Sequence, residues 1–313
     1  MKYRHYTKSF PGVSEIGLGA WQLGASSDWE SMSENEAVNL VHESLDLGIN
    51  FFDTAPNYGN GTSELRLGKA LGRTDRSRIV INTKFGHTDS GDTNFEAGYI
   101  RESLEGSLER LQTDYVDSFI FHNPPLEYLD GNNNAHYEIL EQLKEQGKIK
   151  AYGASLDTCE EMAVFMSTTR GEVIEAFFNI LHQDAGGAFD LAKEKGVGII
   201  VKVPLDSGWL SGKYHEESTF DDIRSRWTKS DIRTRAALVE KLQTIIPEGN
   251  HLAQTAISFC LSYDAVSTVI PGNKDTAQLR ANMESTRNPI SKQLVEKLEY
   301  FYRDEVEKLK LPW

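Results

Sequence analysis

The sequence predicts an α/β protein, a (β/α)8 TIM barrel formed by a single domain over residues 1–313. Short runs rich in β-branched and aromatic residues alternate with amphipathic segments of helical length. This alternation is typical of parallel strands covered by helices. Eight such βα units can be counted, and an eightfold repeat favours a closed barrel over an open sheet.

The repeat can be followed in order along the chain. The expected strands are residues 16–20, 49–53, 79–84, 115–121, 149–154, 173–178, 197–203 and 266–270. The expected helices are residues 34–47 after an N-cap at Ser33, 64–71, 97–111, 135–146, 158–166, 185–195, 251–262 and 276–285.

Three segments fall outside the repeat. The first dozen residues are expected to form a hairpin that closes the bottom of the barrel, and a C-terminal helix is expected over residues 292–309. The third segment, residues 204–246, follows strand seven. Its first part, residues 204–230, is too long for a simple connection and predicts a long functional loop.

The composition indicates a cytoplasmic protein that binds neither nucleic acid nor a membrane. The 47 acidic and 33 basic residues give a net charge of −14, which disfavours a phosphate-rich partner. The N-terminus lacks an apolar signal region, and no run of about eighteen apolar residues could span a bilayer. The two cysteines, Cys159 and Cys260, favour a reducing compartment. The histidines show no metal-binding spacing, so no metal is expected.

Four polar residues coincide with the carboxyl ends of three successive strands. Asp53 ends strand two, Tyr58 lies in the following loop, Lys84 ends strand three, and His122 follows strand four. Each alone has an ordinary structural explanation, as a turn cap, a loop anchor, a surface amine or a hydrogen-bonded strand end. Together at one mouth of a barrel they favour a catalytic site.

The chemistry of these side chains suggests a proton transfer to a carbonyl oxygen. Tyr58 would donate the proton, helped by the positive charge of Lys84, which Asp53 would keep charged. His122 could hydrogen-bond the substrate carbonyl oxygen. Because none of these groups can supply a hydride, the site requires a cofactor.

Characteristic motifs occur in order along the chain: DTAPNYG at 53–59, GTSELRLGKAL at 61–71, INTKFG at 81–86, FIFHNP at 119–124, GKIKAYGAS at 147–155, FFNIL at 177–181, VPLDSGWLSGKY at 203–214 and STVIPGNKDTAQLRANM at 267–283. With these motifs the sequence resembles the aldo-keto reductases over essentially its whole length. The resemblance implies that Asp53, Tyr58, Lys84 and His122 are a catalytic tetrad with Tyr58 as general acid/base. It implies an NAD(P)H-dependent oxidoreductase that interconverts aldehydes or ketones and alcohols.

The resemblance also implies an extended nicotinamide dinucleotide across the barrel mouth, with its adenosine near the segment after strand eight. No GxGxxG motif follows the first strand, which disfavours a Rossmann site. Lys274 or Arg280 could bind a 2′-phosphate, which favours NADP(H) with NAD(H) as the alternative; both could equally be ordinary surface charges. The expected cofactor-binding residues are Ser155, Glu175, Lys202, Pro204, Leu205, Ser207, Leu210, Gly272, Asn273, Lys274, Gln278 and Asn282.

The chain departs from the family pattern at the expected nicotinamide site. Leu156 follows Ser155 where many members have Asn, Glu175 replaces a usual Gln, and Lys202 stands where an aromatic ring often stacks. These changes predict altered cofactor affinity.

The substrate is expected to be a small carbonyl compound. Trp21, Trp29, Trp209 and Trp227 lie in loop-like contexts where aromatic walls would suit an apolar substrate, although packing on the barrel rim is an equal explanation. Trp21 and Trp29, with His122, are the predicted pocket residues.

Two other functions fit the same residues. Lys84 could be the amine of a Schiff-base aldolase, although the neighbouring Asp53 would raise its pKa and weaken it as a nucleophile. A cofactor-binding regulatory subunit could share the fold, because fold does not settle function.

Overall fold

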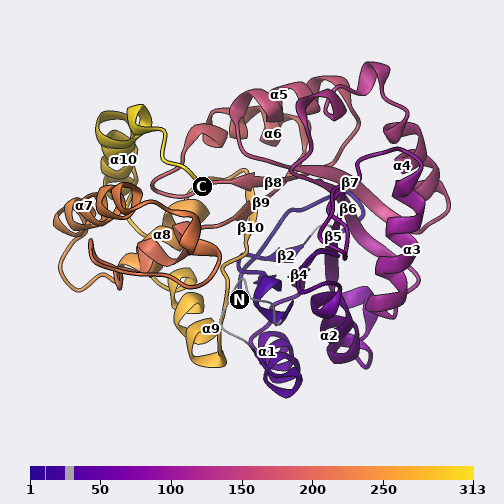
Figure 1. The fold of residues 1–313 in the computed structure, drawn as a ribbon, viewed down its shortest axis with the longest axis horizontal. Helices are drawn as coiled ribbons and strands as arrows, with labels where there is room; N and C mark the ends of the chain where they lie inside the picture. The colour runs from indigo at the N-terminus through magenta and orange to yellow at the C-terminus, as the bar shows by residue number, and fades with distance from the viewer. Residues whose placement is uncertain (11, 25–31) are drawn as a thin grey trace.

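The computed structural model describes residues 1–10, 12–24 and 32–313. Its centre is a sheet of eight parallel strands that pair in chain order. The strands are β3 (Leu18–Gly19), β4 (Phe51–Asp53), β5 (Val80–Phe85), β6 (Val116–His122), β7 (Ile149–Leu156), β8 (Val173–Phe177), β9 (Gly198–Lys202) and β10 (Val266–Val269). All eight predicted strands are confirmed, and Figure 1 shows the helices arranged around them.

The sheet closes between its last strand and its first. Gly17 N donates to Val269 O at 2.9 Å, and Val269 N donates to Glu15 O at 2.9 Å. Parallel bridges join Ile16 to Val269 and Gly19 to Gly272. The protein is therefore a (β/α)8 barrel, as the sequence predicts.

The predicted helices are present with small shifts of their ends. They are α1 (Glu34–Asp46), α2 (Thr62–Leu71), α3 (Tyr99–Leu111), α4 (His136–Glu145), α5 (Cys159–Thr168), α6 (Phe189–Lys195), α8 (Leu252–Leu261) and α9 (Thr276–Met283). The N-cap predicted at Ser33 is confirmed as a capping box, in which Ser33 and Glu36 each accept the other's backbone N–H. The C-terminal helix α10 (Lys292–Phe301) continues as a π-helical segment, Tyr302–Val306, and a 3₁₀ turn, Glu307–Leu309.

The N-terminal hairpin closes the lower end of the barrel. Its strands β1 (Tyr3–Arg4) and β2 (Val13–Ser14) pair antiparallel. Tyr6, in the connection, is fully buried, and its ring packs edge-on against Phe51 at 5.3 Å. Its hydroxyl lies 2.7 Å from Ser118 Oγ on β6. The hairpin expected from the sequence is therefore confirmed, and the other mouth of the barrel lies at the carboxyl ends of the strands.

The segment after β9 contains a helix that the sequence analysis did not identify. Short 3₁₀ turns at Asp206–Ser211 and Ile223–Arg226 are followed by α7 (Lys229–Ile245). A capping box between Thr228 and Asp231 begins the helix. Its buried side includes Ile232, Ala236 and Val239 at helical spacing. The TKSD cap followed by this spacing was the signal that could have revealed it.

Close contact between β7 and β8 makes the barrel sensitive to an added methyl group at Gly153. A Cβ atom there would lie 1.9 Å from the backbone oxygen of Val173. We expect Gly153→Ala to lower the free energy of unfolding by about 1–3 kcal/mol or more, measured as a fall in Tm. Gly98→Ala is the control, because nothing lies within 4 Å of its Cβ position. Equal Tm values for the two variants would contradict this account of the packing.

Candidate active site

The four polar strand-end residues meet at the mouth of the barrel. Asp53 ends β4 and Lys84 lies in β5, and both are almost completely buried. Tyr58 lies in the loop before α2, and His122 ends β6. The structure thus brings together all four residues that the sequence singled out.

Lys84 is the centre of this group. Its Nζ lies 2.8 and 2.7 Å from the two carboxylate oxygens of Asp53 and donates to Thr54 O at 3.0 Å. Tyr58 OH lies 3.5 Å from the same Nζ. The ring of His122 meets the ring of Tyr58 edge-on at 5.8 Å. A hydroxyl, an ammonium and an imidazole therefore surround one small volume.

Tight loop packing fixes the position of Tyr58. Gly59 has φ of 60°, and a Cβ there would lie 1.8 Å from Gly24 O. Only glycine permits this approach of the two loops. Trp21, from the loop after β3, stacks on the Tyr58 ring at 5.6 Å. The phenol is therefore held between Trp21 and Lys84.

The environment shifts the pKa of each ionisable group. Burial, followed by the charge of Glu175, raises the pKa of Asp53 to about 7 although Lys84 opposes this. Burial also raises the pKa of Tyr58, and Lys84 again opposes the shift. For Lys84, burial lowers the pKa, but Asp53 and Glu175 outweigh it and hold the pKa above its usual value. Burial, reinforced by nearby cations, lowers the pKa of His122 well below its usual value, so its ring is neutral at neutral pH.

A second polar cluster adjoins Lys84. Glu175 on β8 places a carboxylate oxygen 3.2 Å from Lys84 Nζ and accepts from Ser155 Oγ at 3.3 Å. Lys202, at the end of β9, donates to Ser155 Oγ at 2.9 Å and to Asn123 Oδ1 at 2.8 Å. Its ammonium also pairs with Asp157 at 2.8 Å. Glu175 and Lys202 are buried, so these contacts offset the free-energy cost of removing their charges from water.

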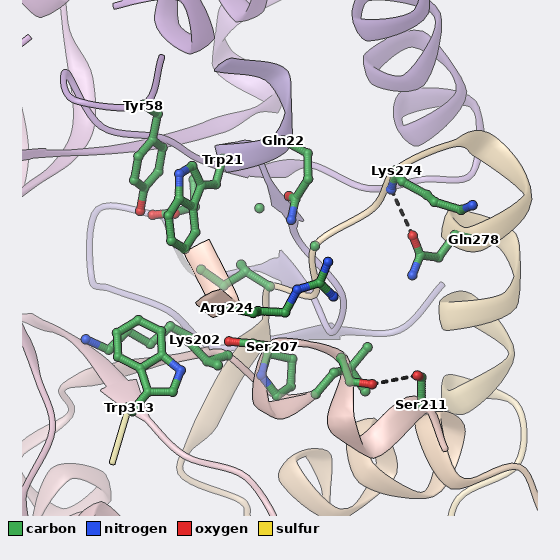
Figure 2. Close-up of a pocket in the computed structure, with 18 of the residues that line it drawn as sticks. Trp21, Gln22, Tyr58, Lys202, Ser207, Ser211, Arg224, Lys274, Gln278 and Trp313 are labelled. Atoms are coloured by element: carbon green, nitrogen blue, oxygen red, sulfur yellow. Dashed lines mark hydrogen bonds between the residues drawn. The ribbon is translucent and has the colours of Figure 1, made fainter. Parts of the chain in front are cut away.

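A cavity of about 900 Å³ extends from these residues towards α9. Figure 2 shows Tyr58, Trp21, Lys202 and Trp313 near one end and Lys274 and Gln278 near the other. The predicted residues that line it are Trp21, Asp53, Tyr58, His122, Glu175, Lys202, Pro204, Leu205, Ser207, Gly272, Lys274 and Gln278. Most of the sequence-predicted residues therefore border one continuous space.

Other predicted residues lie behind the cavity wall. Ser155 is buried beneath Lys202, and Leu210 packs in the hydrophobic core. Asn273 donates to Pro271 O and accepts from Asn282, so these two amides hold the turn before α9. Arg280 forms an ion pair with Glu43 of α1. Trp29 lies outside the described residues.

The tryptophans divide between the two roles considered from the sequence. Trp21 borders the cavity, whereas Trp209 and Trp227 are buried in an aromatic cluster with Phe220. The last two therefore pack the long loop.

Several cavity residues were missed by the sequence analysis. They are Gln22, Asn57, His87, Asn123, Lys213, Arg224 and Trp313. The basic residues in the long loop after β9 were the available signal for Lys213 and Arg224.

Trp313 reaches the mouth because the C-terminal tail folds back over the barrel (Figure 1). The Trp313 ring lies 5.2 Å from the ring of Phe177 at the end of β8. No local pattern predicts such a long-range return.

The donor set fits an elongated anionic cofactor. Lys213 and Lys274 supply positive charge along the cavity of a protein whose net charge is −14, and Arg224, which pairs with Asp222, also borders it. The N-terminus of α9 opens beside the cavity, and helix N-termini favour phosphate groups. Within the described residues, no cluster of His, Cys, Asp or Glu is arranged to hold a metal ion. No helix in the described part of the chain is long and apolar enough to cross a membrane.

A closed βα barrel with ionisable residues at the carboxyl ends of its strands has the architecture of a barrel enzyme. Comparison with known proteins defines the family. The model of the Aldo/keto reductase family matches residues 15–303. The chain therefore belongs to the aldo-keto reductase family, whose (β/α)8 fold it has.

Individual relatives extend this finding. The chain is 30% identical to L-galactose dehydrogenase of Arabidopsis thaliana over 278 residues, covering 87% of this chain and 83% of that protein. It is 30% identical to a probable voltage-gated potassium channel subunit beta of the same plant over 311 residues, with 91% of each covered. The structure of aldo-keto reductase AKR11C1 from Bacillus halodurans, in its holo form, superposes with a TM-score of 0.80 at 29% identity and covers 95% of this chain and 96% of that one.

The buried position of Lys84 makes a specific prediction about stability and pH. Lys84→Met should destabilise the protein by about 3–5 kcal/mol at neutral pH, because Asp53 and Glu175 would lose their shared cation. Lys84 lowers the pKa of Asp53, so its removal raises the folded-state pKa further above the unfolded value of about 4. An acid with a raised folded-state pKa binds its proton more tightly when folded, so the deficit should grow as pH rises through this range.

Thermal unfolding of wild type and Lys84→Met across the same pH series would check this. Lys193→Met is the control, since Lys193 and its partner Asp264 are both exposed. A Tm deficit for Lys84→Met that does not shrink towards acidic pH would refute the electrostatic explanation.

Proposed function

We propose that the chain, acting as one domain, is an NAD(P)H-dependent oxidoreductase that reduces aldehydes or ketones to alcohols, or catalyses the reverse. Tyr58 is the general acid/base. The observation that carries the proposal is the Tyr58 hydroxyl, held 3.5 Å from Lys84 Nζ at the wall of the cavity. The substrate is a small carbonyl compound bound near Trp21 and His122.

Each of the four residues has a distinct part in the reaction. Tyr58 gives its proton to the carbonyl oxygen as negative charge develops there, and Lys84 stabilises the resulting phenolate. Asp53 holds Lys84 in its charged form. The neutral ring of His122 hydrogen-bonds the substrate oxygen and orients it towards Tyr58.

The cofactor supplies the hydride when it is bound. Glu175 and Lys202 border the nicotinamide end of the cavity, with Ser155 behind them. Pro204, Leu205 and Ser207 lie along the middle, where Lys213 and Arg224 offer charge to the pyrophosphate. Gly272 and Gln278 line the distal end, Asn273 and Asn282 hold the turn before α9, and Leu210 packs in the core behind the loop after β9. The fit rests on the cationic lining and on the α9 N-terminus.

We favour NADP(H) over NAD(H) because Lys274 borders the end of the cavity beside α9. Its ammonium lies 3.9 Å from the carboxylate of Asp275, a contact too long to neutralise it tightly. An ammonium at this place would pair with a 2′-phosphate. Cytoplasmic location, with no nucleic acid or membrane partner, remains part of the proposal.

The aldolase alternative is disfavoured by the surroundings of Lys84. Two carboxylates contact its ammonium and hold its pKa above the usual value, whereas a Schiff-base lysine needs a lowered pKa. The similarity to a potassium channel subunit beta favours the regulatory alternative as a second candidate. The assembled Tyr58 and Lys84 pair favours the enzyme, because a purely regulatory protein would not need it.

Removing the Tyr58 hydroxyl separates proton donation from cofactor binding. Tyr58→Phe should lower kcat by about 10²–10⁴-fold, with cofactor affinity within about twofold of wild type. Turnover is followed by NADPH absorbance with a panel of aldehydes and ketones, and affinity by fluorescence titration. Tyr300→Phe, at an exposed position of α10, is the control. Wild-type turnover by Tyr58→Phe would exclude the proposed mechanism.

Cofactor preference can be tested at Lys274. Lys274→Ala should weaken NADPH binding about tenfold and leave NADH binding nearly unchanged, because only NADPH carries the 2′-phosphate. Arg287→Ala is a matched control, since this exposed residue pairs only locally with Glu284. A similar loss for both nucleotides would mean that Lys274 does not read the 2′-phosphate.

A further inference from the structure

A continuous line of polar side chains connects Lys84 to the protein surface. Glu175 lies 3.2 Å from Lys84 Nζ, Ser155 Oγ lies 3.3 Å from the other Glu175 oxygen, and Lys202 Nζ lies 2.9 Å from Ser155 Oγ. Glu175 is 2% exposed and Ser155 is fully buried. Asp157, paired with Lys202 at 2.8 Å, has 41% of its side chain exposed. The line therefore begins at Lys84, beside the Tyr58 hydroxyl, and ends in an ion pair with the partly exposed Asp157.

The proposed reaction gives such a line a use. Each reduction removes one proton from Tyr58, and a line within the protein would return a proton to the phenolate while product and cofactor are still bound. Tyr58 is covered by Trp21 and adjoins the buried Lys84, and bound substrate and cofactor would fill the cavity in front of it. Water therefore has poor access from the cavity side while the ligands are present.

We propose that Glu175, Ser155 and Lys202 form a proton relay that carries protons from solvent at Asp157 to Lys84, and from there to Tyr58. The relay rests on the function proposed above. It assigns Glu175 and Lys202, which differ from the family pattern, a role in the acid/base step.

The hydrogen bonds are oriented for inward transfer. Lys202 donates to Ser155, and Ser155 donates to Glu175, so the proton passes along bonds already formed. In reduction, Lys84 gives a proton to the Tyr58 phenolate. Glu175 takes the Ser155 proton at Oε1 as Ser155 takes a proton from the Lys202 ammonium, so that no alkoxide forms. The Glu175 carboxyl group then rotates and reprotonates the neutral Lys84 amine. The neutral Lys202 amine recovers its proton from water by way of Asp157. One proton enters from solvent for each proton delivered to substrate, and the reverse sequence serves alcohol oxidation.

Several charged groups face Glu175. They are Lys84, Asp53 and, through Ser155, Lys202. Burial and then the charge of Glu175 raise the pKa of Asp53 to about 7. The Glu175 carboxylate therefore lies in electrostatic contact with the ammonium that it would reprotonate.

The other polar line from this site cannot serve the same purpose. Asp53 accepts from Asn82 at 2.7 Å, Asn82 accepts from Ser118, and Ser118 contacts Tyr6. An amide does not exchange protons readily, and Tyr6 is fully buried beneath the barrel. Of these two lines, only the one through Glu175 ends at an exposed ionisable group.

Two substitutions interrupt the relay in different ways. Glu175→Gln keeps the size of the side chain but replaces one acceptor oxygen by an NH2 donor and cannot carry a proton, and Ser155→Ala breaks the line without changing charge. Both should lower kcat by about tenfold or more and increase the solvent deuterium isotope effect. The KM for the carbonyl substrate should stay within about twofold of wild type. Added imidazole buffer should restore part of the lost kcat. Glu172→Gln is the matched control, because Glu172 pairs with Lys144 near the start of β8.

A kcat and isotope effect equal to wild type in Glu175→Gln would overturn the relay while leaving the reductase proposal intact. A lower kcat that imidazole does not restore, together with weaker NADPH binding, would also overturn the relay. That result is expected if Glu175 has a purely structural or cofactor-binding role. A wild-type protein that turns over no carbonyl compound would contradict the proposed function and the relay together.

Discussion

The burial of one ammonium group is the constraint on which the site depends. Lys84 is completely buried in the barrel, and an isolated charge there would cost several kcal/mol. Asp53 on the neighbouring strand β4 and Glu175 across the barrel on β8 offset this cost, but two carboxylates against one ammonium leave a surplus of negative charge. Burial and then this surplus raise the pKa of Asp53, and the two carboxylates keep Lys84 charged. The pKa values of Asp53 and Lys84 thus follow from a buried group of two carboxylates and one ammonium, whose charges do not sum to zero.

The barrel makes this arrangement possible because its parallel strands end at one mouth. Residues far apart in the sequence, such as Asp53, Lys84 and Glu175, come within contact distance when β4, β5 and β8 surround the same interior. The tightly packed loops at Gly24 and Gly59 then fix the phenol against them. A site of this kind needs the closed sheet, since its contacts cross the barrel.

The sequence predicted the elements that carry local or periodic signals. Continuous apolar strands, the Ser33 cap and the strand-end positions of Asp53 and Lys84 can be read from short windows. The structure confirms the barrel and brings the four strand-end residues together. The sequence analysis did not identify α7, although its capping box was local, because the helix lies in the segment 204–246, to which no helix was assigned. Nor could it predict Trp313 at the mouth, since this contact depends on the path of the whole C-terminal tail.

Ser155 links the buried charges of Lys202 and Glu175. Each charge has an ionic partner of its own, because Lys202 pairs with Asp157 and Glu175 contacts Lys84. Ser155 lies between the two, accepting from Lys202 and donating to Glu175. A change at either position alters the hydrogen bonds of Ser155 that the other position depends on, so we expect the two to be energetically coupled in a double-mutant cycle.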